Sequence, residues 1–105
     1  MRNVRPLPLN DANFLQKLRG VIVDTSRVQL TTHARDRMRT RRVSFRQVLE
    51  CLRQGRVCEA AHLTVRGDWK ATLLHQYAGD VVRVAVALRR TGDDDFAVVI
   101  TVIDE

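Results

Sequence analysis

Residues 30–42, LTTHARDRMRTRR, carry the densest charge in the chain, and their pattern predicts a helix. Thr32 is the expected N-cap, because its hydroxyl can accept a hydrogen bond from an N–H group of the first turn. Leu30, Ala34 and Met38 recur at every fourth position and form a narrow apolar stripe. We therefore expect this helix to pack against the rest of the protein through that stripe.

A second stripe on the same helix contains His33, Arg37 and Arg41, again at four-residue spacing. These side chains border the apolar stripe, so a docked helix holds them in one row at the edge of its contact with the protein. Such a position lets a side chain be both held in place and reached by a ligand. The arginines expected to point outward and to bind nucleic acid are Arg35, Arg39, Arg42 and Arg46.

The length of 105 residues predicts one domain, with residues 1–27 as an extension containing a helix and residues 28–103 as the core. Residues 1–9 include two prolines and are expected to be irregular. No apolar run approaches the roughly 20 residues that span a bilayer, and the N-terminus lacks the apolar core of a signal peptide. A cytoplasmic protein with no membrane contact is therefore expected.

The net charge of +6 is unevenly placed, with +8 in residues 1–46 and −2 in residues 47–105. This asymmetry favours a polyanionic partner, most often a nucleic acid, although an acidic protein would satisfy the same field. Cys51 and Cys58 form no zinc-ligand spacing with the three histidines, and both are expected to be small buried residues. We therefore expect no metal and no cofactor.

Periodicity changes along the chain from helical to alternating. A first helix is expected over residues 11–19, ended by Gly20. A further helix over residues 44–53 has Ser44 and Gln47 as a capping box and Gly55 as its C-terminal signal.

After Gly55, alternation predicts strands over residues 56–64, 69–77, 81–89 and 96–103, joined by short turns. The third and fourth of these are apolar at nearly every position, so they are expected to lie inside the sheet. The predicted fold is α+β, with helices packed on a four-stranded, mainly antiparallel sheet.

Several segments together carry a resemblance to a known family. They are THAxxRMxxR (residues 32–41), the helix that follows with Gly55, GDW (67–69), VxVxVAL (82–88) and VITVI (99–103). Across residues 28–103 the chain resembles the bacterial domain-of-unknown-function family marked by a His-Ala dipeptide. That family is similar in layout to the RelE/BrnT-like toxins, which are small basic ribonucleases.

The resemblance implies a RelE-like fold, RNA as the partner, and an acidic antitoxin-like protein that neutralises the toxin. The sequence departs from many RelE-like enzymes because it ends directly after the fourth strand, without a further catalytic segment. The only tyrosine, Tyr77, matches no such role. The helix that contains His33 is therefore expected to contribute to any chemistry.

RNA cleavage by the 2′-hydroxyl needs a base, a cation at the phosphate and an acid for the leaving oxygen. His33 can serve as base or acid; the positive end of the helix dipole disfavours its protonated form and keeps a neutral imidazole available. Arg37 and Arg41 can bind the phosphate. The polar residues of the predicted strands that can join them are Lys70, Arg83 and Thr101.

Three functions remain open at this point. The leading hypothesis is a metal-independent endoribonuclease of toxin type. The second is a non-catalytic nucleic-acid-binding or regulatory domain, and the third is a protein-interaction module whose basic helix docks an acidic partner. In the structural alternatives, His33 caps or packs the helix, Lys70 protects a sheet edge, and Thr101 is a good strand former.

Overall fold

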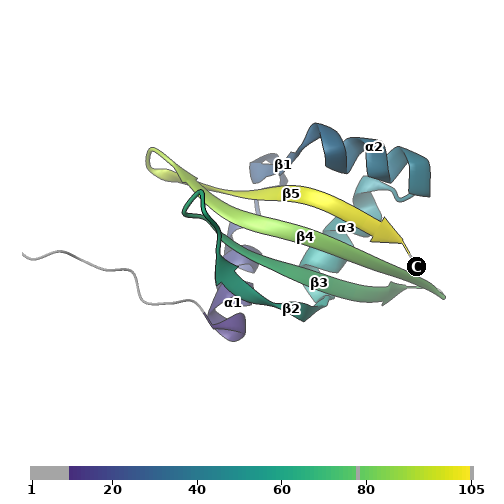
Figure 1. Cartoon of the computed structure of the whole chain (residues 1–105), viewed down its shortest axis with the longest axis horizontal. Helices are drawn as coiled ribbons and strands as arrows, with labels where there is room; N and C mark the ends of the chain where they lie inside the picture. Colours follow the sequence, from purple (N-terminus) through teal and green to yellow (C-terminus); the bar gives the residue numbers. More distant parts are fainter. Residues whose placement is uncertain (1–9, 78, 105) are drawn as a thin grey trace, which may run out of the picture.

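The computed structural model describes residues 10–77 and 79–104, so the irregular segment expected over residues 1–9 lies outside it. The described part folds as three α-helices packed on a five-stranded mixed sheet, which agrees with the predicted α+β class (Figure 1). None of its helices is long and apolar enough to cross a membrane. In chain order the elements are α1 (Asp11–Val21), a 3-10 turn (Thr25–Arg27), β1 (Val28–Leu30), α2 (Thr32–Arg41), α3 (Phe45–Gln54), β2 (Arg56–Leu63), β3 (Trp69–Tyr77), β4 (Asp80–Thr91) and β5 (Asp94–Asp104).

The sheet has five strands in the order β1-β5-β4-β3-β2, so the prediction of four strands was wrong. The missed strand, β1, is three residues long and pairs parallel with β5, with Leu30 opposite Val99. A segment this short does not show an alternating pattern, and its partner lies far along the chain. The other four strands are antiparallel, and β4 and β5 lie inside the sheet as expected.

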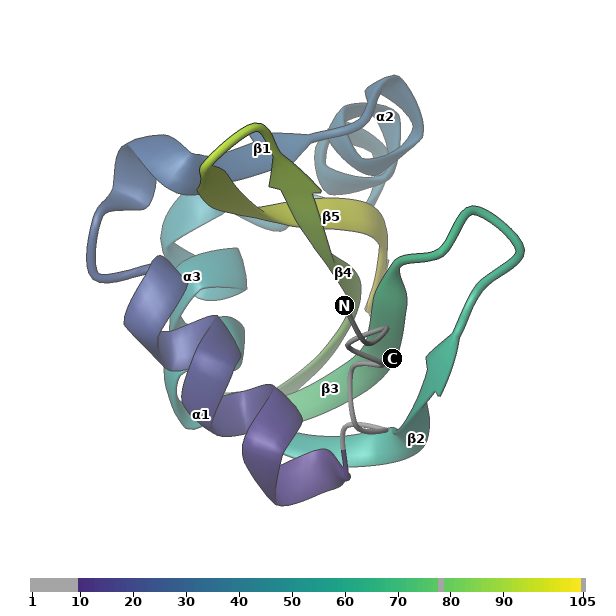
Figure 2. The same ribbon diagram turned by 90° about the vertical axis from the view of Figure 1, so that its left-hand side faces the viewer.

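Two helices, α1 and α3, cover one face of the sheet, and Figure 2 shows the sheet curving around them. Phe14 of α1 and Leu52 of α3 meet Leu73, Val84 and Val99 of the sheet in one hydrophobic core. The opposite face of the sheet, here called the open face, carries the alternate residues of the same strands. The third helix, α2, does not cover either face but lies beside β5 (Figures 1 and 2).

Helix α1 is longer than expected. Asn10 caps it by accepting a hydrogen bond from the Asn13 N–H at 2.8 Å. The helix does not end at Gly20 but continues to Val21, because Ile22 just beyond is buried in the core and draws the chain inward. Gly20 is exposed and has no positive φ, so its sequence signal was misleading.

The N-cap of α2 is Thr31, not Thr32 as predicted. The Thr31 Oγ1 accepts the Ala34 N–H at 3.0 Å and its hydroxyl donates to the Ile100 carbonyl at 3.0 Å. The Thr31 N–H also donates to the Val99 carbonyl at 3.1 Å. Pairing with β5 keeps the backbone extended through Thr31, which decides between two adjacent threonines that are equally good caps by sequence.

Helix α3 begins with the predicted capping box, in which Ser44 Oγ accepts from the Gln47 N–H at 3.1 Å and Gln47 Oε1 accepts from the Ser44 N–H at 2.8 Å. Gly55 ends the helix with a negative φ of −68°. A Cβ atom at Gly55 would lie 2.4 Å from the Cys51 carbonyl oxygen, so close packing and not backbone conformation requires glycine there.

Register shifts interrupt two strands and change which side chains reach the open face. In β5, Ala85 of β4 pairs with Thr101 and Val86 pairs with Val99, so Ile100 is an extra, bulged residue. In β2, shifts fall between Val57 and Glu59 and between Glu59 and His62. Such bulges turn the residues that follow them toward the other face.

The two cysteines have different environments, which corrects the expectation that both are buried. Cys51 of α3 is fully buried, and its thiol contacts the Leu73 and Val82 carbonyls. Cys58 is exposed on the edge strand β2, next to a register shift. Burial raises the pKa of the Cys51 thiol to about 12, which keeps it protonated and unreactive in the folded protein.

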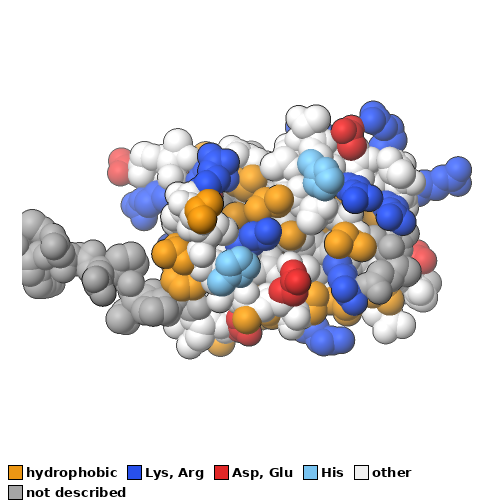
Figure 3. Space-filling model, in the orientation of Figure 1, with side chains coloured by type: hydrophobic (Ala, Val, Ile, Leu, Met, Phe, Trp, Pro, Cys, Tyr) orange, Lys and Arg blue, Asp and Glu red, His pale blue; other side chains and the backbone are white. Residues whose placement is uncertain are grey.

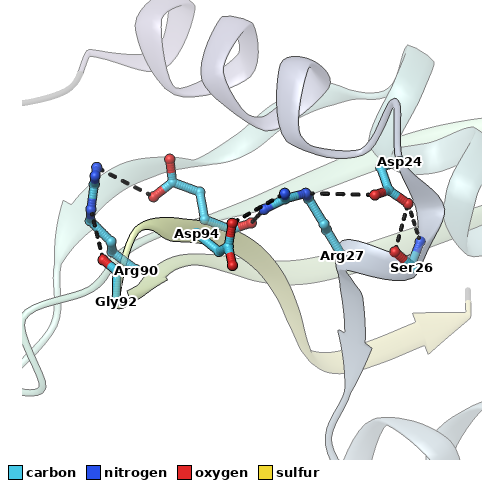
Figure 4. A network of polar contacts seen from close by, with 7 residues as sticks. Asp24, Ser26, Arg27, Arg90, Gly92 and Asp94 are labelled. Carbon is cyan, nitrogen blue, oxygen red and sulfur yellow. Dashed lines mark hydrogen bonds and ion pairs between the residues drawn. The ribbon is translucent and has the colours of Figure 1, made fainter.

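The hairpin between β4 and β5 is tighter than expected, and two of the aspartates at its tip, Asp94 and Asp95, form ion pairs with Arg27 and Arg90. Arg27 lies between Asp24 and Asp94 (Figure 4), and its guanidinium donates to Asp94 at 3.2 Å and to the Asp95 carbonyl at 3.2 Å. The same guanidinium lies 5.9 Å from the centre of the Phe96 ring. These contacts tie the segment before β1 to the start of β5.

Candidate functional site

The open face lies between two raised borders. Figure 2 shows α2 on one side of it and the β2–β3 hairpin on the other. Figure 3 views this face and shows Lys and Arg side chains along α2 and across the strands, together with histidine and acidic side chains. Chemically active groups are therefore concentrated on the side of the sheet that α1 and α3 leave uncovered.

His33 meets the sheet at Thr101. It is the second residue of α2, its side chain is exposed, and its Nε2 lies 3.1 Å from the Thr101 Oγ1. Without the bulge at Ile100, strict alternation along β5 would place Thr101 on the core face with Val99. The bulge thus brings Thr101 to the open face, where the imidazole reaches it.

A single row of residues crosses four strands and ends at His33. The register pairs Glu59 with Thr72, Thr72 with Ala85, and Ala85 with Thr101. The Thr72 hydroxyl donates to Glu59 Oε1 at 2.6 Å. Because neighbouring strands lie about 4.8 Å apart, the backbones of Glu59 and Thr101 are about 14 Å apart. A carboxylate and an imidazole therefore stand at opposite ends of one row.

The middle of this row is hollow. A depression of about 150 Å³, here called the central hollow, is lined by Glu59, Lys70, Thr72, Arg83, Ala85, Thr101 and Ile103. Ala85 is a small residue between larger ones, which leaves room above it.

Two cations flank the row at this hollow. Lys70 precedes Thr72 by two residues on β3, and Arg83 precedes Ala85 by two residues on β4. Because β3 and β4 are antiparallel, the two side chains stand on opposite sides of the row. Both are half-buried, so solvent screens their charges less than those of fully exposed residues.

All three polar strand residues selected from the sequence, Lys70, Arg83 and Thr101, thus line one hollow, and His33 contacts one of them. Arg37 and Arg41 do not line it. Arg37 is half-buried and Arg41 is exposed, one and two turns after His33 on α2. They extend the basic border of the open face beyond the hollow.

The four arginines expected to bind nucleic acid are all exposed. Arg39 pairs with Asp36 on the same helix at 2.9 Å. Arg42 ends α2 in the left-handed conformation with φ of 57°, and Arg46 lies in the first turn of α3. With Arg35 they form a basic surface around α2, here called the α2 basic surface, outside the central hollow.

Sequence reasoning missed three residues of the open face: Glu59, Thr72 and His62. Glu59 was missed because the two register shifts in β2 hide which way its side chain points. Thr72, 6 % exposed, is the one buried polar residue in the described part of the chain. His62 pairs in register with Lys70 and so shares its face. The available signal was an acidic residue within a predicted strand.

Within the described residues, no group of three or more His, Cys, Asp or Glu side chains is placed to hold a metal ion. The candidate groups for chemistry on the open face are therefore the imidazole of His33, the carboxylate of Glu59 and the cations of Lys70 and Arg83. Such a set can bind an anion and transfer protons at it.

Comparison with known proteins gives one match. No curated protein and no solved structure matches the chain. The family model described as "Domain of unknown function (DUF4258)" matches residues 30–104, from the last residue of β1 through β5, and so includes α2 and every residue of the central hollow. Because the match extends over well more than half of its length, the chain belongs to the DUF4258 family.

Proposed function

We propose that the open face binds RNA and cleaves it as a RelE-like, metal-independent endoribonuclease. The observation that carries this proposal is the central hollow, where two cations flank a row that ends in a carboxylate and an imidazole. The net charge of +6 adds a long-range attraction for a polyanion.

A backbone phosphate fits the central hollow above Ala85. Lys70 and Arg83 lie on its two sides and neutralise the charge that develops on the phosphorane oxygens. The Thr101 hydroxyl adds a hydrogen-bond donor at the same place. Because both cations are half-buried, their attraction for phosphate exceeds that of the exposed arginines.

Glu59 and His33 are the proton carriers in this proposal. The Glu59 carboxylate removes the proton of the 2′-hydroxyl, whose oxygen attacks phosphorus. The phosphorus–O5′ bond breaks, and the His33 imidazolium protonates the departing O5′. The products are a 2′,3′-cyclic phosphate and a 5′-hydroxyl.

The order of the groups along the row suits this chemistry. An in-line transfer needs a base and an acid on opposite sides of phosphorus, each within a hydrogen bond of about 2.8 Å from its oxygen. Thr72, which binds Glu59, and Thr101, which contacts His33, have backbones about 10 Å apart, two strand spacings. The two threonines thus lie on either side of the place above Ala85 where the phosphate is proposed to bind.

The test is incubation of the purified chain with single-stranded RNA in the presence of EDTA, followed by analysis of the product ends. We expect 2′,3′-cyclic phosphate ends. We also expect the rate to fall about 10²- to 10⁴-fold in His33→Ala and in Glu59→Gln, as for loss of a general acid or base. Thr32→Ala, an exposed change in the same helical turn, is the matched control. Cleavage at wild-type rate in both site variants would refute the mechanism.

A second function, non-catalytic nucleic-acid binding, is favoured by the α2 basic surface, which lies outside the central hollow. In that case RNA binds but is not cleaved. Each arginine-to-alanine change then reduces the slope of log K against log salt concentration by about 0.7 for single-stranded RNA. The same surface also suits an acidic antitoxin-like protein. Absence of any salt-dependent RNA or DNA binding would leave that partner as the better explanation of the surface.

A further inference from the structure

A second depression lies next to the central hollow on the open face. It has a volume of about 300 Å³ and lies between the β2–β3 hairpin and the start of α2. We call it the hairpin hollow. Its walls include the apolar side chains of Val65, Ala87 and Ile100, and Lys70 lines both this hollow and the central one.

The hairpin wall of this hollow is held in place by hydrogen bonds. Thr64 N–H donates to the Asp68 carbonyl at 2.8 Å, and Gly67 N–H donates to the Thr64 carbonyl at 2.9 Å. From β4, the Arg89 guanidinium reaches Asp68 Oδ2 through Nη2 at 3.0 Å and Nε at 3.1 Å. This ion pair is largely buried on the Asp68 side and fixes the hairpin against the sheet. The hollow is therefore pre-formed.

Val65, at the tip of this hairpin, is a fully exposed apolar side chain. It stands beside the hollow together with Arg66, whose planar guanidinium is suited to stacking on an aromatic ring. An apolar wall, a stacking cation at the rim and a volume at the lower end of small-ligand pockets suit a flat heteroaromatic ligand.

We propose that the hairpin hollow binds one nucleobase of a single-stranded RNA whose phosphate lies in the central hollow. The two hollows share Lys70, and the rows of Lys70 and Thr72 are two residues apart on β3, about 7 Å, within the reach of one nucleotide. A base paired inside a duplex cannot enter a side pocket, so the substrate class is single-stranded RNA. This inference rests on the RNA-binding part of the proposed function.

The experiment measures affinity with an uncleavable probe, a 2′-O-methyl RNA heptamer, as a single strand, as a duplex with its complement, and with one abasic residue at its centre. Val65→Ser removes apolar wall at an exposed site, and Val23→Ser is the matched control, because Val23 is also exposed but lies away from the open face. Ala87→Leu fills the hollow from its floor, with its folding checked by circular dichroism.

We expect the wild-type chain to bind the single strand at least tenfold more tightly than the duplex. Val65→Ser should weaken single-strand binding about fivefold, from loss of apolar contact, and Val23→Ser should not change it. The abasic heptamer should bind wild type and Val65→Ser equally, because the group that contacts Val65 is missing.

Equal affinity of wild type and Val65→Ser for the intact heptamer, or equal affinity for single strand and duplex, overturns the nucleobase site and leaves phosphate binding untouched. If none of the probes binds, the nucleobase site and the proposed function both fail. If the single strand binds with the expected sensitivity to Val65 but RNA is not cleaved, the nucleobase site stands and the ribonuclease proposal fails.

Discussion

Replacing Thr31 with valine tests how His33 is held at the sheet. The Thr31 hydroxyl both caps α2 through the Ala34 N–H and donates to the Ile100 carbonyl, each at 3.0 Å. Valine keeps the branched shape and the extended backbone but removes both hydrogen bonds. The start of α2, and with it the contact between His33 and Thr101, then loses its attachment to β5.

The cost follows from these two losses. An N-cap threonine contributes about 1 kcal/mol, and a hydrogen bond to a half-buried carbonyl contributes about 1 kcal/mol more. For a protein of this size, about 2 kcal/mol lowers the Tm by about 8–16 °C. Local loosening should also weaken the NMR signature of the contact between the His33 ring and Thr101.

The assay is urea unfolding of Thr31→Val beside Thr32→Val, followed by circular dichroism. Thr32 is exposed and lies one residue later, so its change to valine should alter stability by less than about 0.5 kcal/mol. Equal stability of the two variants would show that Thr31 does not cap the helix. A larger loss of stability in Thr32→Val would show that Thr32 is the N-cap, as the sequence alone suggests.

Gly55→Ala should destabilise the protein by about 2–3 kcal/mol, because the new Cβ meets the Cys51 carbonyl. Gly20→Ala, whose Cβ enters open space, should stabilise it by about 0.5–1 kcal/mol. Urea unfolding measures both free energies, and similar changes in the two variants would contradict the packing argument. Arg42→Gly should stabilise the protein by about 0.5–1 kcal/mol and so raise the Tm, because glycine adopts a φ of 57° without strain. A lower Tm would refute this. A thiol reagent should modify Cys58 rapidly and Cys51 only upon unfolding; equal rates would contradict the burial of Cys51. The pKa of the Cys51 thiol is about 9 in the unfolded chain and about 12 in the folded one, so the thiol's contribution to stability is complete below pH 9 and decreases from pH 9 to 12. Cys51→Ala should therefore flatten the plot of unfolding free energy against pH in this range, and an unchanged plot would refute the argument.

Local signals predicted well those parts of the fold that depend on local contacts. The capping box of Ser44 and Gln47 is formed as expected, and the four long strands occur at nearly the predicted positions. In each case the deciding contacts lie within a few residues, or the hydrophobic pattern is long enough to set the element. The same kind of signal failed at Gly20, because burial of Ile22 outweighs the tendency of glycine to end a helix.

The candidate site was only partly predictable, because its assembly depends on long-range register. The polar character of Lys70, Arg83 and Thr101 within apolar strands selected them, but alternation could not place Thr101 on the open face without knowledge of the bulge at Ile100. Glu59 was missed for the same reason on β2. The capping by Thr31 could not be chosen over Thr32 without the parallel pairing of β1 with β5.

The bulge at Ile100 also links the survival of the site to the survival of the fold. Regular pairing of β5 in its place, with Ile100 opposite Ala85, would turn Thr101 into the interior and expose Val102, which is now fully buried. Loss of the bulge at unchanged chain length would thus disrupt the core and the contact between His33 and Thr101 together. Selection for a soundly folded protein alone would then conserve the orientation of Thr101, even in a descendant that no longer used it.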